Sequence, residues 1–378
     1  MSVELTEEQG MIQDMAAGFA ADNMALHAAK WDEEKHFPID VMRASAELGF
    51  AAIYAGEEFG GSGLSRFDAV LIFEQLSKGC PTVAAYISIH NMVTWMIDRF
   101  GSDELRAKYI PSLTTMEKFA SYCLTEPGAG SDAGGLKTKA VRDGDVFKLS
   151  GTKQFISGAG VSDVYLIMAR TGDDGAGGVS AFLVDKDTPG LSFGANEKKM
   201  GWNAQPTRQV IMDDVAVPAS QMIGAEGDGF KIAMMGLDGG RLNIAACSLG
   251  GAQSALEQSL DYVKERKQFN QTLAQMQNTQ FKLADMEVDL QSSRLMLYTA
   301  AQKLDAKTPD ATPWCAMAKR LVTDKCFDVA NQALQLHGGY GYLSEYNVER
   351  IVRDLRVHQI LEGTNEIMRV IIARHLLK

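Results

Sequence analysis

The chain has 378 residues, of which 46% are hydrophobic and 22% charged, a composition typical of a globular protein with more than one domain. Its formal net charge of -11 disfavours nucleic acid or an anionic membrane as the main partner. The cysteines and histidines are dispersed and form no CxxC pair, so neither disulfides nor a metal site are expected.

The N-terminal segment is acidic and has no apolar core of the kind that a signal peptide carries. No apolar run reaches the length that spans a membrane. We therefore expect no membrane partner. The expected location is the bacterial cytoplasm, or the mitochondrial matrix for a processed eukaryotic chain.

Apolar residues at helical spacing predict an N-terminal helical domain over residues 1–118. The predicted helices cover residues 7–29, 39–48, 67–76, 84–100 and 104–113. From residue 119 to 225, short β-branched runs alternate with Gly, Pro and Asp turns, which predicts a middle antiparallel β domain.

Long amphipathic helices return in the C-terminal domain, residues 226–378. They are predicted over residues 229–267, 275–303, 313–336, 346–353 and 365–377. Short links between long helices predict an antiparallel four-helix bundle. The expected fold class is α+β, mostly α, in the order helical, β, helical.

Glu362 is the strongest candidate for a catalytic group. It follows two apolar residues and precedes Gly363, at the start of a helix that Thr364 or Asn365 would cap. Burial behind an apolar wall raises the pKa of a carboxylate, which suits a general base near neutral pH. The alternative is an acid that only complements the helix dipole.

The loop over residues 122–132 offers backbone donors and hydroxyls where the β domain begins. Such a concavity suits a phosphate or the polar edge of a cofactor ring, although an ordinary Pro-Gly turn has the same composition. It lacks the GxGxxG pattern of a dinucleotide-binding βαβ unit. Downstream, Phe155 and Ser157 would point to one side of a strand and could flank a flat ring, or be a core Phe and a surface Ser.

Three further segments combine glycine with charge. Gly239 and Gly240 lie inside a predicted helix, where each costs about 1 kcal/mol relative to Ala. They indicate a kink, a close helix crossing, or a ligand beside Arg241. Arg266 ends that helix, where it complements the dipole or binds a pyrophosphate. The run 335–342 has more glycines than a helix C-cap needs.

Together these segments resemble the acyl-CoA dehydrogenase family over nearly the whole chain. The signatures are residues 124–132, residues 335–342 with Glu345, Arg350 and Asp354 downstream, and residues 361–364. Runs 85–92, 115–127, 201–208 and 358–363 are similar to members of the family that act on isobutyryl-CoA. Some relatives place the base at the position of Gly240, whereas this chain keeps Glu362.

The resemblance implies an FAD enzyme with Glu362 as catalytic base. Residues implied at the flavin are Tyr122, Leu124, Thr125, Gly130, Ser131, Phe155, Ile156, Ser157, Thr364, Asn365 and Glu366. Those implied at the pyrophosphate and adenosine, partly across a subunit interface, are Arg266, Phe269, Met276, Gln277, Gln335, Leu336, Gly338 and Gly339. Those implied at the acyl-CoA are Ser131, Asp238, Gly239, Gly240, Arg241 and Arg374.

The implied reaction converts isobutyryl-CoA to methacrylyl-CoA, a step of valine catabolism, in a homotetramer. Glu362 would remove the α-proton, and electrons would leave through an electron-transferring flavoprotein. Three alternatives stay open. They are a different short straight or branched acyl-CoA as substrate, an oxidase that uses oxygen, and a non-catalytic acyl-CoA or flavin-binding protein.

Overall fold

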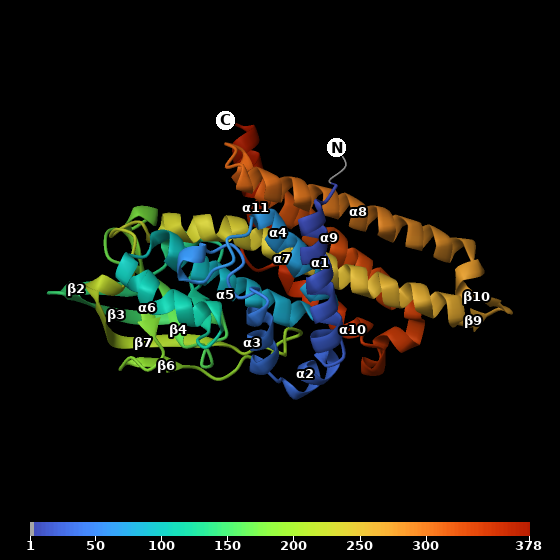
Figure 1. The fold of residues 1–378 in the computed structure, drawn as a ribbon, viewed down its shortest axis with the longest axis horizontal. Helices are drawn as coiled ribbons and strands as arrows, with labels where there is room; N and C mark the ends of the chain where they lie inside the picture. The colour runs from blue at the N-terminus through green and yellow to red at the C-terminus, as the bar shows by residue number, and fades with distance from the viewer. Residues whose placement is uncertain (1–3) are drawn as a thin grey trace.

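The structure of the protein, a computed structural model, describes residues 4–378. Figure 1 shows a β sheet at one end of an elongated molecule and long helices that extend to the other end. The chain passes from helices to the sheet and back to helices. This order confirms the α+β, mostly α, fold class that the sequence predicts.

The N-terminal region contains six α-helices. They are α1 (Glu7–Ala20), α2 (Ala28–Glu34), α3 (Ile39–Glu47), α4 (Arg66–Gly79), α5 (Pro81–Phe100) and α6 (Asp103–Thr114). The prediction of one helix over residues 7–29 is wrong, because a π-helical turn at Ala21–Ala25 separates α1 from α2. Within that turn the side-chain amide of Asn23 donates to the carbonyl of Phe19, 3.2 Å away, and so competes with the backbone ladder.

The middle region forms one eight-stranded sheet in the order β6-β7-β3-β2-β4-β5-β8, with β1 beside β4. The strands are β1 (Ala120–Cys123), β2 (Lys139–Asp143), β3 (Val146–Ser157), β4 (Val164–Arg170), β5 (Val179–Asp185), β6 (Leu191–Phe193), β7 (Thr207–Pro218) and β8 (Met222–Ile223). Most pairs are antiparallel, as predicted, but β1 runs parallel to β4 and β2 touches β4 in parallel at one residue pair. Parallel pairing is feasible because the β2–β3 hairpin supplies the long crossover between β1 and β4.

The C-terminal region holds three long helices and two shorter ones. They are α7 (Gly229–Glu265), α8 (Gln277–Asp305), α9 (Ala311–His337), α10 (Val348–Arg356) and α11 (Asn365–Leu376). A small hairpin, β9 (Lys267–Gln268) and β10 (Gln271–Thr272), joins α7 to α8 at the far tip of the molecule (Figure 1). Helix α9 packs against all four of the others. From residue 4 onward, no helix is both long and apolar enough to cross a bilayer.

Helix α7 also joins the N- and C-terminal regions, since it packs against α4 and α5. At the crossing with α4, a side chain at Gly250 would overlap the backbone carbonyl of Glu74. The Glu74 carboxylate is buried and binds Arg294 of α8, with a Nη2–Oε1 distance of 2.8 Å, and the hydroxyl of Tyr298 at 3.0 Å. One glycine therefore sets how closely α4 approaches α7, and the buried acid beside it ties α4 to α8.

This crossing predicts that Gly250→Ala lowers the free energy of unfolding by roughly 1–3 kcal/mol, because backbone atoms of α4 cannot yield as a flexible side chain would. The matched control is Gly18→Ala in α1, where an added Cβ meets nothing within 4 Å. The control should be neutral or stabilising by up to about 1 kcal/mol. Urea unfolding of both variants checks the prediction, and equal stabilities of the two would contradict it.

Candidate active site

Glu362 lies in the short connection between α10 and α11. Its backbone φ is 55° and that of Gly363 is 90°, so two consecutive residues adopt the left-handed conformation. A non-glycine residue in this region is strained by about 1–3 kcal/mol and persists only where its surroundings hold it. The hydroxyl of Thr364 accepts a hydrogen bond from the backbone N–H of Ile367, 3.3 Å away. Thr364 is therefore the N-cap of α11, and Asn365 is its first residue.

One oxygen of the Glu362 carboxylate is withdrawn from solvent, while the residue as a whole is half-buried. Its Oε2 atom is buried and has no hydrogen-bond partner within residues 4–378. Burial raises the pKa of Glu362 to about 7, although the positive charges of Lys319 and Arg241 act in the opposite direction. A carboxylate with this pKa can both accept and release a proton near neutral pH.

The two glycines of α7 make room for side chains from elsewhere in the chain. An added Cβ at Gly240 would lie 2.5 Å from Glu362 Oε2 and 3.1 Å from the sulfur of Met92. At Gly239 it would overlap the guanidinium of Arg66. Helix α7 continues through both positions, so the glycines do not interrupt it. They allow the Glu362 carboxylate and the guanidinium of Arg66 to approach the helix backbone.

Arg241 lies beneath the Glu362 turn and is 4% exposed. Its Nη1 pairs with Asp238 Oδ1 at 2.6 Å, and its Nε donates to the backbone carbonyl of Glu362 at 3.4 Å. The second oxygen of Asp238 accepts from the hydroxyl of Thr312 at 2.6 Å. This pair therefore supports the turn from α7, and any role in binding a substrate stays a prediction.

Tyr122 of β1 connects the sheet to this turn. Its hydroxyl is buried and makes no hydrogen bond with any residue that the structure describes. Burial raises the pKa of Tyr122 first, and the nearby charge of Glu362 raises it further. The structure thus brings the predicted base and the first of the predicted flavin residues to one place.

The loop after β1 is held by an ion pair inside the sheet. Glu126 Oε1 lies 2.8 Å from Lys153 Nζ, which also donates to the carbonyl of Leu124 at 3.0 Å. The same carboxylate accepts from the backbone N–H groups of Lys137 and Thr138, at 2.6 and 2.9 Å. Farther along the loop, Gly130 faces open space, since an added Cβ would meet nothing within 4 Å. The loop is therefore fixed at its base and open at its tip, where Ser131 is exposed.

Residues Phe155, Ile156 and Ser157 lie beside this loop. The hydroxyl of Ser121 in β1 donates to the carbonyl of Ser157 in β3, 2.6 Å away. Phe155 has a φ of 60°, at a shift of register in the pairing of β3 with β7, so strand alternation does not predict which way it points. The side chain is 64% exposed, which rules out the reading of Phe155 as a core residue. Ile156 is buried instead.

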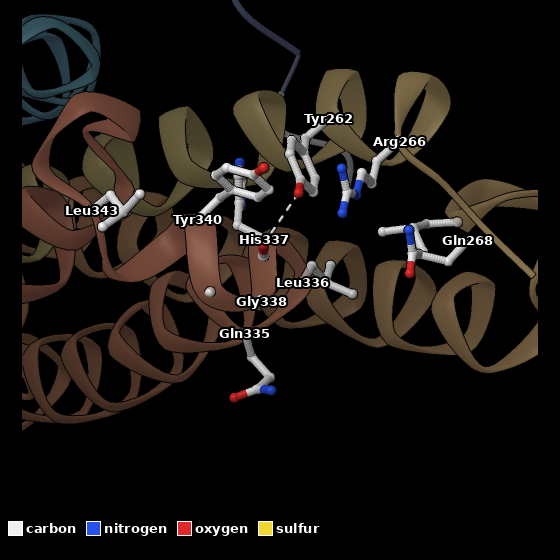
Figure 2. A pocket seen from close by; sticks show the side chains of 11 residues that line it. Tyr262, Arg266, Gln268, Gln335, Leu336, His337, Gly338, Tyr340 and Leu343 are labelled. Carbon is white, nitrogen blue, oxygen red and sulfur yellow. Dashed lines mark hydrogen bonds between the residues drawn. The ribbon is translucent and has the colours of Figure 1, made fainter.

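A cavity with a volume of about 420 Å³ lies at the end of α7 that is far from Glu362 (Figure 2). It is lined by Tyr262, Arg266, Gln268, Leu273, Gln335, Leu336, His337, Gly338, Gly339, Tyr340 and Leu343. Five of these residues are predicted adenosine or pyrophosphate ligands. Three other predicted ligands do not line it. Phe269 lies on the β9–β10 turn and is 89% exposed, and Met276 and Gln277 lie where α8 begins.

The walls of this cavity are aromatic and cationic. Tyr262 stacks on His337 with ring centroids 4.3 Å apart, and its hydroxyl donates to the carbonyl of His337 at 3.2 Å (Figure 2). The guanidinium of Arg266 lies 5.2 Å from the ring centroid of Tyr340. An added Cβ at Gly338 or Gly339 would point into open space. Gly338 and Gly339 therefore leave backbone accessible to a ligand, as the sequence indicated, whereas Gly341 is buried and an added Cβ there would overlap the carbonyl of Leu334.

The two sites are far apart within one chain. Arg266 follows Gly240 by 26 residues along α7, which corresponds to about 39 Å at the rise of an α-helix. In Figure 1 the sheet and the β9–β10 hairpin lie at opposite ends of the molecule. The structure therefore divides the predicted cofactor residues into two groups that one extended FAD cannot connect.

Three predicted residues of α11 differ in their surroundings. Glu366 is exposed and pairs with Arg369 at 3.2 Å, and Arg374 is exposed in the last turn of the helix. Asn365 is buried, and its side-chain amide is fully engaged by α9. Only the backbone of Asn365 is thus free to contact a cofactor.

Several residues of these sites are not predicted from the sequence. Lys319 is fully buried beside the Glu362 turn, on an α9 face that also carries Cys315, Val322 and Cys326. A lysine at helical spacing with apolar residues was a usable signal. Tyr262 lies one helical turn before Arg266, a spacing that could have indicated a shared face. Arg66 had no local signal.

Comparisons with known proteins agree with this architecture. Three family models match: the acyl-CoA dehydrogenase N-terminal domain over residues 6–117, the middle domain over 121–215 and the C-terminal domain over 227–377. Two relatives, both described as "Isobutyryl-CoA dehydrogenase, mitochondrial", are 56% identical in Bos taurus and 58% identical in Dictyostelium discoideum. In both cases the match spans 100% of this chain and 91% of the relative.

A solved structure is similar over the full length. It is a chain from work on the electron transferring flavoprotein of Acidaminococcus fermentans, 38% identical to this one, with a TM-score of 0.97 and complete coverage of both chains. Family models, relatives and fold are thus consistent over nearly every described residue. The chain belongs to the acyl-CoA dehydrogenase family.

Proposed function

We propose that the protein is an FAD-dependent dehydrogenase that converts isobutyryl-CoA to methacrylyl-CoA, with Glu362 as the catalytic base. The observation that carries the proposal is the Glu362 carboxylate, which has one buried oxygen without a hydrogen-bond partner in the described chain and a pKa raised to about 7. The choice of acyl group rests on the two relatives named for isobutyryl-CoA.

The geometry of the turn suits abstraction of an α-proton. Gly240 leaves Glu362 Oε2 against the backbone of α7, and no donor in residues 4–378 holds that oxygen. The lone pair is therefore available to a carbon-bound proton of a ligand in the site. A bound acyl chain would exclude water and strengthen every charge interaction of the carboxylate.

The same turn offers a donor for the thioester oxygen. The backbone N–H of Glu362 forms no hydrogen bond with the described residues. Removal of the α-proton places negative charge on the thioester oxygen, and a fixed N–H stabilises that charge. One residue would then supply both the proton acceptor and an oxyanion donor, which explains the need for its strained left-handed backbone.

The residues near the sheet fit a flavin ring. Within residues 4–378 the Tyr122 hydroxyl lacks a hydrogen-bond partner, the tip of the 124–131 loop is open at Gly130, and Phe155 exposes an aromatic face. Exposed aromatic surface beside unpaired polar groups is typical of a site that a ligand covers. FAD, when bound there, would accept the hydride from the β-carbon.

The distance between the two sites supports a shared cofactor. A flavin near Tyr122 cannot reach the Arg266 cavity of the same chain, about 39 Å along α7 from Gly240. The cavity would instead bind the adenosine and pyrophosphate of an FAD held by another subunit of a homotetramer. We also propose an electron-transferring flavoprotein as the electron acceptor, since the similar chain from Acidaminococcus fermentans comes from work on such a flavoprotein.

A panel of acyl-CoA thioesters checks the substrate. We expect kcat/KM with an artificial electron acceptor to be highest for isobutyryl-CoA and lower for 2-methylbutyryl-, butyryl- and octanoyl-CoA. Partial activity on 2-methylbutyryl-CoA should remain, because one methylene in an apolar pocket changes binding by only about 1–3 kcal/mol. A preference of about tenfold for butyryl- or octanoyl-CoA would contradict the substrate but not the family. If no acyl-CoA bleached the bound flavin, the chain would be a non-catalytic binding protein. Rapid aerobic turnover without an added electron acceptor would indicate an oxidase.

The raised pKa of Glu362 predicts an unusual dependence of stability on pH. The folded chain binds this proton more tightly than the unfolded chain, so stability from this group falls as pH rises from about 4.5 to about 7. Glu362→Gln removes the titration. The free energy of unfolding of the variant apoprotein should therefore be larger than that of the wild type by on the order of a few kcal/mol at pH 8. This difference should shrink towards pH 4.

Urea unfolding at both pH values measures this difference. Glu366→Gln is the matched control, because this exposed carboxylate in the first turn of α11, four residues after Glu362, has a lowered and not a raised pKa. If the increase in the free energy of unfolding were equal in the two variants, or independent of pH, Glu362 would titrate normally.

A further inference from the structure

Lys319 is a buried ammonium whose hydrogen bonds all lie on the turn that carries Glu362. Its side chain has no exposed surface, and Nζ donates to the backbone carbonyl of Gly363 at 2.8 Å and to Asn365 Oδ1 at 2.9 Å. Throughout the described chain, no carboxylate forms an ion pair with it. Burying an unpaired charge costs several kcal/mol, so another interaction must offset that cost.

The contacts of Lys319 fix both sides of Gly363. Lys319 binds the Gly363 carbonyl directly, while the Asn365 amide donates to Thr323 Oγ1 at 2.9 Å and to Asp324 Oδ1 at 2.7 Å. Lys319, Thr323 and Asp324 all belong to α9. This helix therefore anchors the segment that follows Glu362, whose left-handed backbone requires such support.

The charges around Glu362 come from several elements. The cations are Lys319 of α9 and Arg241 of α7, and the other titratable neighbours are Tyr54 before α4, Tyr122 of β1 and Cys247 of α7. Arg241 is already paired with Asp238. Around Lys319 itself, Asp324 and Glu366 also contribute negative charge.

Arg241 is neutralised by its ion pair with Asp238, whereas Lys319 has no ion-pair partner among the described residues. Lys319 therefore provides the less compensated of the two positive charges near Glu362. Burial lowers the pKa of Lys319 to about 8, and the charge of Glu362 is the largest influence that opposes this fall. The two buried groups thus stabilise each other's charged forms.

We propose that Lys319 is a positioning residue for the reaction, which anchors the Glu362–Gly363 turn and keeps the Glu362 carboxylate ionised before substrate binds. The proposal rests on the proposed role of Glu362 as base. A residue that only joined α9 to α11 would need the two hydrogen bonds but not the charge. Hydrogen bonding and charge are separable by substitution.

The test compares Lys319→Met, Lys319→Gln and Lys319→Arg in the FAD-loaded protein. Glutamine retains a hydrogen-bond donor without charge, and arginine retains the charge. The ionisation of Glu362 is followed in the absence of substrate by the infrared band of its protonated carboxyl group. This band is assigned to Glu362 because it is missing in Glu362→Gln. The rate of flavin reduction by isobutyryl-CoA is then measured from pH 6 to pH 10.

In both neutral variants the midpoint of the Glu362 band should rise by about 1–3 pH units, because an opposite charge nearby is lost. Flavin reduction at pH 7 should fall roughly fivefold or more and recover at higher pH, with KM changed by less than about twofold. Lys319→Arg should keep a midpoint near that of the wild type. Lys325→Met, a half-exposed lysine of the same helix paired with Asp289, should leave the midpoint unchanged.

The proposal would be overturned if either neutral variant, folded and loaded with FAD, showed the same midpoint of the Glu362 infrared titration as the wild type. If Lys319→Met does not fold, Lys319→Gln alone decides the test. The infrared measurement does not depend on catalysis. Failure of Glu362 as the base would appear separately, as flavin reduction that persists in Glu362→Gln while the band still shifts in the Lys319 variants.

Discussion

The proposed active site depends on one constraint, which is the burial of a carboxylate oxygen against a helix that has no side chain at that point. Glu362 Oε2 occupies the space that Gly240 leaves free, and no group in the described chain donates to it. Burial opposes ionisation, and the cations on α7 and α9 partly offset it. The balance between these opposing effects places the pKa where a proton can be exchanged.

Three long-range features of the fold contribute to the surroundings of Glu362. Helix α7 must pass unbroken through two glycines, α9 must hold the turn from one side, and β1 must bring Tyr122 from the sheet. At Glu362 a left-handed backbone and a buried oxygen without a hydrogen-bond partner in the described chain occur in one residue. A stable protein tolerates such local costs at a functional site because its remaining contacts are consistent with the fold.

The arrangement also separates two tasks along one helix. In the proposed function the chemistry takes place near Gly240, while the Arg266 cavity at the far end of α7 has aromatic, cationic and glycine walls suited to a nucleotide. One chain contains both groups of residues, which lie too far apart for one FAD to connect. Assembly and cofactor binding are expected to be coupled for that reason.

Local signals predicted much of this from the sequence. The cap at Thr364, the glycines before Arg241 and the order of helical and β regions follow from short-range spacing and turn chemistry. Contacts between residues that are distant in the sequence could not be predicted in this way. Lys319 reaches a carbonyl 44 residues away. The parallel pairing of β1 with β4 and the shift of register at Phe155 depend on the assembled sheet, which no local pattern encodes.

The most direct test of the central claim is the rate of flavin reduction in Glu362→Gln. The FAD-loaded variant and wild type are mixed anaerobically with isobutyryl-CoA in a stopped-flow instrument, and flavin absorbance is followed. The substitution removes only the proton acceptor, so FAD and substrate should still bind while reduction slows by about 10²–10⁴-fold. Reduction within about tenfold of the wild-type rate would contradict the assignment of Glu362 as the base.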